Sequence, residues 1–343
     1  MTKAVALLSG GLDSRLAIKV IQEQGIEVEA LYFITLFSPC TSGASRKTEA
    51  MDAAEQLGVS LKTVNTSREM LEIIKNPKHG YGKNMNPCID CRINMLREAA
   101  KYMRESGADF IVTGEVLGQR PMSQRRDAMR IIDREAGTEG LVLRPLSAKL
   151  LEPTVPEKMG LVDREKLPEI SGRSRKPQMQ LAETLGIRDY PSPAGGCLLT
   201  QSGFARKMRD LIEHGDPDLN DVHLLKTGRH FRLDEKTWVV IGKDHADNRK
   251  IATFARKGDT IIETVDVPGP TTLVRGPIRA ACSGGGASDE KIEIAARLTA
   301  RYSQGRRNET VTVALYDYGG KEPKRTVPVR PAAMEEYREM LIE

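Results

Sequence analysis

The chain is poor in aromatic residues and has no long apolar run. Phe, Trp and Tyr together make up 4% of its 343 residues, and one residue is Trp. No apolar stretch reaches the roughly 20 residues that a membrane-spanning helix needs. Asp13 and Arg15 also interrupt the short apolar stretch at the N-terminus, which excludes a secretory signal. We therefore expect a cytoplasmic protein that does not insert into a membrane.

The chain also lacks a strong excess of charge of one sign, and it has few cysteines. Its 52 basic and 47 acidic residues give a net charge of +5, which permits a polyanionic partner without requiring one. The five cysteines are an odd number, at spacings that do not indicate a secreted disulfide framework. In a reducing compartment, clustered cysteines more often bind a metal or take part in chemistry.

The N-terminal half alternates apolar strands with helices. Residues 4–8 form a continuous apolar run, and further strands are predicted at 28–34, 59–64 and 109–113, with helices between them. This alternation is typical of a parallel sheet with helices on both faces. The fold class that we predict is α/β: a Rossmann-like parallel sheet followed by a smaller α+β domain at the C-terminus.

A change of composition divides the chain. After about residue 150, prolines punctuate a loop-rich segment, and beyond residue 200 short β-like stretches precede a helix. We predict an N-terminal nucleotide domain over residues 1–200, a linker over 201–224 and a C-terminal domain over 225–343.

The turn after the first strand has the composition of a phosphate site. It reads Ser9-Gly10-Gly11-Leu12-Asp13-Ser14, and a helix follows it directly. Its glycines let backbone N–H groups face an anion, and the helix N-terminus adds partial positive charge. Ser9 and Ser14 offer hydroxyl donors, and Asp13 could ligate a Mg²⁺ ion that bridges the phosphates. The alternative is a glycine-rich connection in which Ser14 only caps the helix.

This turn resembles the PP-loop of the ATP pyrophosphatases and lacks the longer spacing and Lys of a Walker loop. That family cleaves ATP between its α and β phosphates and adenylates a substrate, with Asp13 in a catalytic position. The resemblance implies an adenine nucleotide hydrolase-like PP-loop fold, ATP and Mg²⁺. It assigns nucleotide binding to Ser9, Gly10, Gly11, Asp13, Ser14, Phe33 and Gly114.

Three cysteines have sequence surroundings that are typical of reactive or metal-binding thiols. Cys88 and Cys91 form a Cys-x-x-Cys at the start of a predicted helix, where backbone amides and the helix dipole are expected to lower the thiol pKa values. Cys197 ends the turn Pro193-Ala-Gly-Gly-Cys197, which has little steric bulk. Cys40 and Cys282 lie in other contexts, and we interpret them as inert.

The number of these cysteines leaves several readings open. Three thiols are one short of a closed zinc site, and they are the number that holds a [4Fe-4S] cluster with one open iron. We favour the cluster, bound by Cys88, Cys91 and Cys197. The alternatives are a dithiol that works through persulfide and disulfide chemistry, a zinc site, and a buried structural pair.

The order of the motifs resembles tRNA thiouridine synthases. Asn86-Pro-Cys-Ile-Asp-Cys91 and Gly-Gly-Cys197 are similar to the paired catalytic cysteine motifs of bacterial tRNA 2-thiouridylases. Thr113–Gln124 resembles the Thr-Gly-Glu-x-x-Gly-Gln-x-x-Ser-Gln motif of the tRNA 4-thiouridine synthases, in which an Arg-Pro-Leu follows, as Arg144-Pro145-Leu146 does here. In these enzymes ATP adenylates a uridine carbonyl oxygen, and sulfur then displaces AMP.

The resemblance implies a tRNA sulfurtransferase that forms AMP and diphosphate, with 4-thiouridine as the expected product and 2-thiouridine as the alternative. Its partners would be tRNA and a sulfur donor, either sulfide or a persulfide carrier protein. Cys88, Cys91 and Cys197 would supply or ligate the sulfur. The residues expected to contact RNA near the target base are Gln119, Arg120, Ser123, Gln124 and Arg125.

The second half resembles the RNA-binding domain of the NFACT family. The similarity rests on Trp238-Val-Val-Ile-Gly242, Val267-Pro-Gly269 and Tyr302-Ser303, and it implies contact with structured RNA. Two other functions remain as alternatives: a PP-loop enzyme that acts on a small-molecule cofactor precursor, and an RNA-binding module with a regulatory nucleotide domain. The sequence leaves the oligomeric state, including a homodimer, open.

Overall fold

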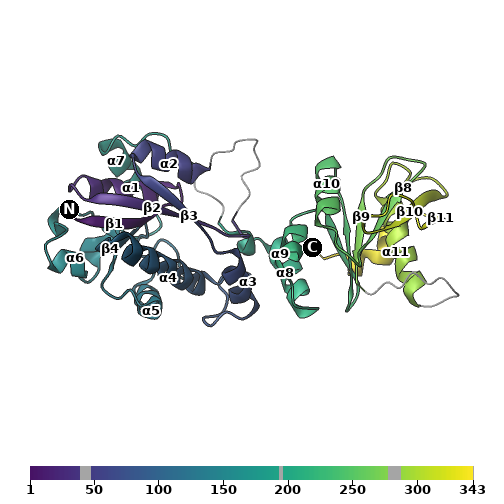
Figure 1. Cartoon of the computed structure of the whole chain (residues 1–343), viewed down its shortest axis with the longest axis horizontal. Helices are drawn as coiled ribbons and strands as arrows, with labels where there is room; N and C mark the ends of the chain where they lie inside the picture. The colour runs from purple at the N-terminus through teal and green to yellow at the C-terminus, as the bar shows by residue number, and fades with distance from the viewer. Residues whose placement is uncertain (39–47, 193–195, 277–286, 343) are drawn as a thin grey trace. The chain divides into compact units, whose positions relative to one another are not determined.

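The computed structural model describes residues 1–38, 48–192, 196–276 and 287–342, and it divides the chain into two compact units (Figure 1). These units are Met1–Thr200 and Gln201–Glu343. Cys40 and Cys282, interpreted above as inert, lie outside the described residues. In the part of the chain that is described, no helix is both long and apolar enough to cross a membrane.

The first unit is built on a five-stranded parallel sheet, which confirms the predicted fold class. The strand order is β3-β2-β1-β4-β5. The strands are β1 (Lys3–Leu7), β2 (Glu27–Ile34), β3 (Ser60–Asn65), β4 (Phe110–Thr113) and β5 (Val142–Leu143). The helices are α1 (Leu12–Gln22), α2 (Glu49–Leu57), α3 (Ser67–Lys75), α4 (Cys88–Ser106), α5 (Arg126–Ala136), α6 (Val155–Lys158) and α7 (Lys176–Thr184).

Alternate side chains of the central strands enter two separate cores. Ala4 and Ala6 of β1 belong to the core that α1, α2 and α7 cover, whereas Val5 and Leu7 belong to the core under α4 and α5 (Figure 1). Because β1 is buried on both faces, its sequence is continuously apolar rather than alternating. Helices on both faces of the sheet follow from this pattern.

The strand order creates one point at which the chain reverses its direction across the sheet. β1 pairs with β2 on one side and with β4 on the other, and all three run parallel. At such a switch point the connections that leave the carboxyl ends of the two strands diverge and leave a crevice, where open α/β sheets bind their ligands. Here those connections are the turn 8–11 after β1 and the segment 114–125 after β4.

The second unit contains a six-stranded antiparallel sheet in the order β11-β10-β8-β9-β7-β6, which confirms the predicted α+β domain. α11 (Ala287–Arg301) packs on this sheet, with Ala295, Ala296 and Leu298 in the core. The strands are β6 (Arg229–Asp234), β7 (Thr237–Ile241), β8 (Thr260–Thr264), β9 (Thr272–Arg275), β10 (Val311–Asp317) and β11 (Arg325–Val329). Its other helices are α8 (Ser202–Glu213), α9 (Leu219–Leu225), α10 (His245–Phe254) and α12 (Met334–Tyr337).

The segment 201–224, predicted as a linker, instead holds α8 and most of α9. Phe204, Met208 and Leu211 recur at helical spacing on α8 and are buried. Gly215 and Pro217 interrupt the helical pattern between the two helices, which gives the segment the composition of a linker in the sequence.

Candidate active site

The phosphate loop is held closed by its own serine side chains. Ser14 Oγ donates to the Gly11 carbonyl at 2.9 Å and accepts from the Ser9 backbone N–H at 3.3 Å. The N-cap position of α1 is Gly11, which has no side chain to cap the helix. The first-turn N–H groups of α1 therefore stay available for an anion, and Ser14 does more than cap the helix.

Two glycines allow neighbouring segments to touch this loop. Gly10 has φ +83°, and a Cβ atom there would lie 2.5 Å from the carbonyl carbon of Glu49 in α2. A Cβ atom on Gly114 would lie 2.6 Å from the backbone nitrogen of Ser14. Gly114 thus serves the predicted nucleotide site by letting the end of β4 approach the loop.

Asp13 carries an oxygen that suits a divalent cation. Its Oδ2 accepts a 3.1 Å hydrogen bond from Gln119 Nε2, whereas its Oδ1 is buried and has no hydrogen-bond partner. A buried carboxylate oxygen without a donor is uncommon, and Mg²⁺ is usually bound by one or two carboxylates together with substrate phosphates. Asp13 therefore fits the predicted magnesium role, and Gln119 fixes its orientation.

The segment predicted to contact RNA divides into exposed and buried residues. Arg120 and Arg125 are exposed and can meet a polyanion. Ser123 and Gln124 are only 2% and 3% exposed, so in this conformation their side chains cannot contact a base. The Gly118 N–H donates to the Gln124 carbonyl at 2.7 Å, so Gln124 closes the loop that presents Gln119.

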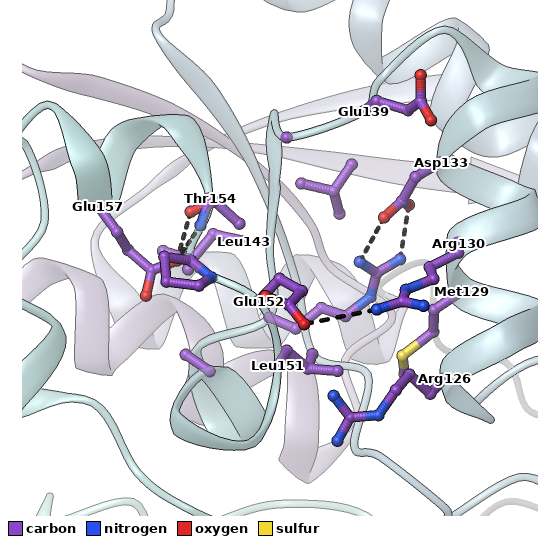
Figure 2. Close-up of a pocket in the computed structure, with 15 residues that line it drawn as sticks. Arg126, Met129, Arg130, Asp133, Glu139, Leu143, Leu151, Glu152, Thr154 and Glu157 are labelled. Atoms are coloured by element: carbon purple, nitrogen blue, oxygen red, sulfur yellow. Dashed lines mark hydrogen bonds and ion pairs between the residues drawn. The ribbon is translucent and has the colours of Figure 1, made fainter.

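A buried ion network anchors the same segment to the sheet. Arg144 Nε donates to Glu115 Oε2 at 3.0 Å, and its two terminal nitrogens donate to the two oxygens of Asp133 at 2.8 and 2.7 Å (Figure 2 shows the pair at Asp133). Burial alone would raise the pKa of Glu115, but the guanidinium groups of Arg144 and Arg92 hold it below its usual value. The Thr-Gly-Glu and Arg-Pro-Leu motifs therefore meet in the fold as one charge network.

The Cys-x-x-Cys lies in the first turn of α4, which begins at Cys88. The expectation of lowered thiol pKa values is wrong for both cysteines. Burial raises the pKa of Cys88 despite the nearby charges of Arg92 and Arg120, and it raises the pKa of Cys91 to about 11. Removal of the thiolate from water outweighs its favourable position at the helix N-terminus.

The Cys197 segment approaches the residues that precede this pair. The Leu198 N–H donates to the Phe37 carbonyl at 2.9 Å, and the Met85 N–H donates to the Leu199 carbonyl at 3.2 Å. All three predicted cysteines are free thiols of intermediate exposure. The fold therefore brings the segment that follows Cys197 next to Met85, three residues before Cys88.

The predicted metal cluster does not fit the arrangement of these side chains. Within residues 1–38, 48–192, 196–276 and 287–342, no three or more His, Cys, Asp and Glu side chains form a group that could hold a metal ion. Cys88, Cys91 and Cys197 are included in that range. We therefore derive no chemical step through an iron–sulfur cluster or a zinc ion.

Phe33, also predicted to bind the nucleotide, is a core residue. It is 6% exposed and belongs to the core under α4. Its ring is therefore committed to packing and cannot stack on an adenine in this conformation.

Cys91 is expected to react slowly with iodoacetamide at neutral pH. With a thiol pKa of about 11, little thiolate is present. The fraction at pH 8 is on the order of 10⁻³, against roughly a quarter for a free thiol with a pKa of about 8.5. The alkylation rate should rise about tenfold per pH unit up to pH 10. Peptide mass spectrometry measures the alkylation rate of Cys91 in the folded protein and in the same protein unfolded in urea. Equal alkylation rates in the two states at pH 7 would contradict the prediction.

Family comparisons agree with this division of the chain. Residues 1–149 match the model for the thiamine biosynthesis protein (ThiI), and residues 228–341 match the model for the NFACT protein RNA binding domain. A tRNA-specific 2-thiouridylase MnmA from Sulfurimonas denitrificans is 33% identical over 122 residues, which are 34% of this chain and 36% of that protein. A probable tRNA sulfurtransferase from Geobacillus kaustophilus is 32% identical over 149 residues, covering 42% of this chain and 34% of that protein.

The matched region spans about a third of the length of each of these two relatives. Among solved structures, a 4-thiouridine synthetase–RNA complex with bound ATP is 24% identical, with a TM-score of 0.34, and the match covers 54% of this chain and 52% of that one. A TM-score that low does not establish a shared fold, so the fold rests on the sheet topology above. The two family matches confirm both predicted resemblances: residues 1–149 are similar to the ThiI family, and residues 228–341 are similar to the NFACT RNA-binding domain.

Proposed function

We propose that the chain is an ATP-dependent tRNA sulfurtransferase that converts a uridine to 4-thiouridine, with 2-thiouridine as the alternative product. The observation that carries the proposal is the hydrogen bond between Asp13 of the phosphate loop and Gln119 of the thiouridine-synthase motif. It joins the predicted ATP site to the predicted RNA site at the switch point of the sheet. The two relatives described above are named as a tRNA-specific 2-thiouridylase and a probable tRNA sulfurtransferase, which are both tRNA-thiolating activities.

The proposed reaction has two balanced steps. The uridine carbonyl oxygen attacks the α phosphorus of ATP, and diphosphate leaves. With sulfide as the donor, hydrosulfide then attacks the activated ring carbon; the carbon–oxygen bond breaks, AMP departs with the original oxygen, and the sulfur loses its remaining proton. The loop N–H groups would hold the phosphates, and Asp13 would ligate Mg²⁺, which supplies positive charge against the phosphate oxygens.

The substrate is proposed to be tRNA because cationic side chains lie beside the site. Arg120 and Arg125 are exposed, as are Arg126 and Arg130 of α5. Such side chains position a phosphate backbone without reading its sequence. The RNA-binding domain match supports the same substrate and disfavours a small cofactor precursor, which needs no second domain of this kind.

The sulfur chemistry is proposed to use three cysteines of the first unit, Cys88, Cys91 and Cys197. A dithiol of Cys88 and Cys91 agrees with their positions in one helical turn. The [4Fe-4S] hypothesis requires Cys197 to join them, and the arrangement described above does not group the three. Anaerobic purification with metal analysis and a visible absorption spectrum distinguishes a cluster, zinc and bare thiols. The sulfur donor is then identified by supplying sulfide or a persulfide carrier protein.

The proposal predicts a loss of tRNA thiouridine in a strain without the gene. Nucleosides from total tRNA are digested and measured by mass spectrometry, and re-expression of the wild-type chain should restore the thiolated nucleoside. In vitro, the purified chain with unmodified tRNA, ATP, Mg²⁺ and sulfide should form AMP and thiouridine in equal amounts. Unchanged thiouridine in the deletion strain, with no redundant enzyme present, would overturn the assignment; AMP formation with a small molecule in place of tRNA would support the alternative.

A further inference from the structure

Arg15 is a buried cation inside the phosphate loop motif to which the reaction above gives no role. Its side chain starts from the first turn of α1, and the residue is 3% exposed. Burial lowers the pKa of this guanidinium, while the charges of Asp52, Glu49 and Asp189 oppose that shift. A buried guanidinium needs hydrogen-bond acceptors, and the positions of those acceptors indicate its role.

The acceptors of Arg15 come from three separate segments. Its Nε donates to the Gly10 carbonyl at 2.8 Å. One terminal nitrogen donates to the Asp189 carbonyl at 2.8 Å, and it also donates to the side chain of Gln56 on α2. The guanidinium therefore joins the phosphate loop to α2 and to residues 186–192, the segment that leads toward Cys197.

The contact with Gly10 fixes the orientation of one peptide of the loop. In a planar trans peptide the C=O and the following N–H point in opposite directions. Because Arg15 holds the Gly10 carbonyl on the side of α2, the Gly11 N–H points to the other side of the loop. That N–H makes only a long 3.4 Å contact with Ser9 Oγ, so it remains available to a phosphate oxygen.

The backbone of Gly10 makes this orientation dependent on Arg15. Gly10 adopts φ +83°, a region in which glycine moves freely, and the first turn of α2 lies against it at Glu49. Without a donor for its carbonyl, the Gly10–Gly11 peptide is free to rotate and to turn its oxygen toward the incoming phosphate. A carbonyl in that position would repel the ligand.

We propose that Arg15 is a positioning residue that presets the Gly10–Gly11 peptide for ATP and links the phosphate loop to the segment that leads to Cys197. The inference rests on the proposed use of ATP by this loop. Its expected signature is a change in the KM for ATP that leaves the KM for tRNA unaltered. A residue needed only for folding would instead reduce the active fraction, and with it kcat, at unchanged KM.

The test compares Arg15→Met, Arg15→Lys and Gln56→Ala with the wild-type chain. AMP formation is measured against ATP and tRNA separately, and ATP·Mg²⁺ binding is measured by calorimetry. We expect Arg15→Met to raise the KM and Kd for ATP about 10- to 100-fold, because small misplacements of binding groups have effects of that size. Arg15→Lys keeps the charge but cannot reach all three acceptors, so its effect should fall between those of wild type and Arg15→Met.

Gln56→Ala and one control variant keep the test decisive. Gln56 is exposed, so Gln56→Ala should fold normally and raise the KM for ATP about two- to threefold through the loss of one acceptor. Lys19→Met is the control, since Lys19 lies on the same helix and pairs with Glu23 near the surface. An unchanged KM for ATP in folded Arg15→Met or Arg15→Lys would overturn the inference. A wild-type chain that does not bind ATP would instead overturn the proposed function.

Discussion

Replacement of Asp13 by Asn is expected to reduce AMP formation by on the order of 10³-fold, or about 4 kcal/mol in the activation barrier. The amide keeps an oxygen that can accept the hydrogen bond of Gln119, so the loop contact survives. What the substitution removes is the negative charge at the buried Oδ1, which has no hydrogen-bond partner. Without that charge the site loses its ligand for a divalent cation.

Two measurements separate this effect from a general loss of structure. ATP binding by the wild-type chain should be strengthened by Mg²⁺, whereas the affinity of Asp13→Asn should no longer depend on Mg²⁺. Glu23→Gln is the matched control, because it also neutralises a carboxylate. Glu23 lies just past the C-terminal end of α1, is 55% exposed and pairs with Lys19. AMP formation by Asp13→Asn within tenfold of wild type would contradict the role assigned to Asp13.

The parallel sheet and the phosphate loop could be predicted because both depend on local patterns. A buried parallel strand reads as a continuous apolar run, as Ala4–Leu8 does, and the loop glycines are needed for close backbone approach. Gly10 and Gly114 show that requirement directly, since a Cβ atom on either would overlap neighbouring backbone. The two units were predictable for the same reason, because the pattern of strands and helices changes near residue 200.

The thiol pKa values and the exposure of the RNA segment could not be predicted, because both depend on packing between distant segments. Cys91 lies in the first turn of α4, a position that lowers a thiol pKa, but tertiary burial reverses the direction of the shift. Ser123 and Gln124 are polar in the sequence and buried in the fold. The helices α8 and α9 were missed for a local reason: Gly215 and Pro217 between them give the segment the composition of a linker, although the apolar residues of α8 recur at helical spacing.

The pairing of Glu115 with Arg144 is a third feature that only the fold reveals. Both residues stand in the motifs that resemble the 4-thiouridine synthases, 29 positions apart in the chain. The sequence signal was a Glu and an Arg at fixed places in two motifs, without any sign that they meet. Their contact gives these motifs a physical role: they position the segment that carries Gln119.

Arg144→Met is expected to lower the stability of the first unit by about 3–5 kcal/mol, which is the usual cost of removing one partner from a buried ion pair. The Arg144 and Glu115 side chains are 4% and 3% exposed, so water cannot replace the hydrogen bonds that either side chain loses. Loss of the guanidinium leaves Glu115 buried beside the Thr113 hydroxyl and the more distant Arg92, and it leaves Asp133 without its two donors. For a unit of this size, such a loss corresponds to a fall in Tm of about 10 °C.

Calorimetric unfolding of the full chain at several pH values tests this prediction. Arg130→Met is the control, because Arg130 is 66% exposed and its partner Glu152 is 76% exposed. Exposed ion pairs contribute at most about 1 kcal/mol to the free energy of unfolding. The double variant Glu115→Gln with Arg144→Met should recover part of the loss, since it removes a buried charge that has lost its closer partner, Arg144. The pKa of Glu115 is lowered in the folded state, so its stabilising contribution is complete above the unfolded value of about 4.3 and is lost as the pH falls below it. The wild-type chain should therefore lose its advantage in stability over Glu115→Gln in acid. Equal stability of Arg144→Met and Arg130→Met at neutral pH would show that the network does not hold the segment that carries Gln119 in place.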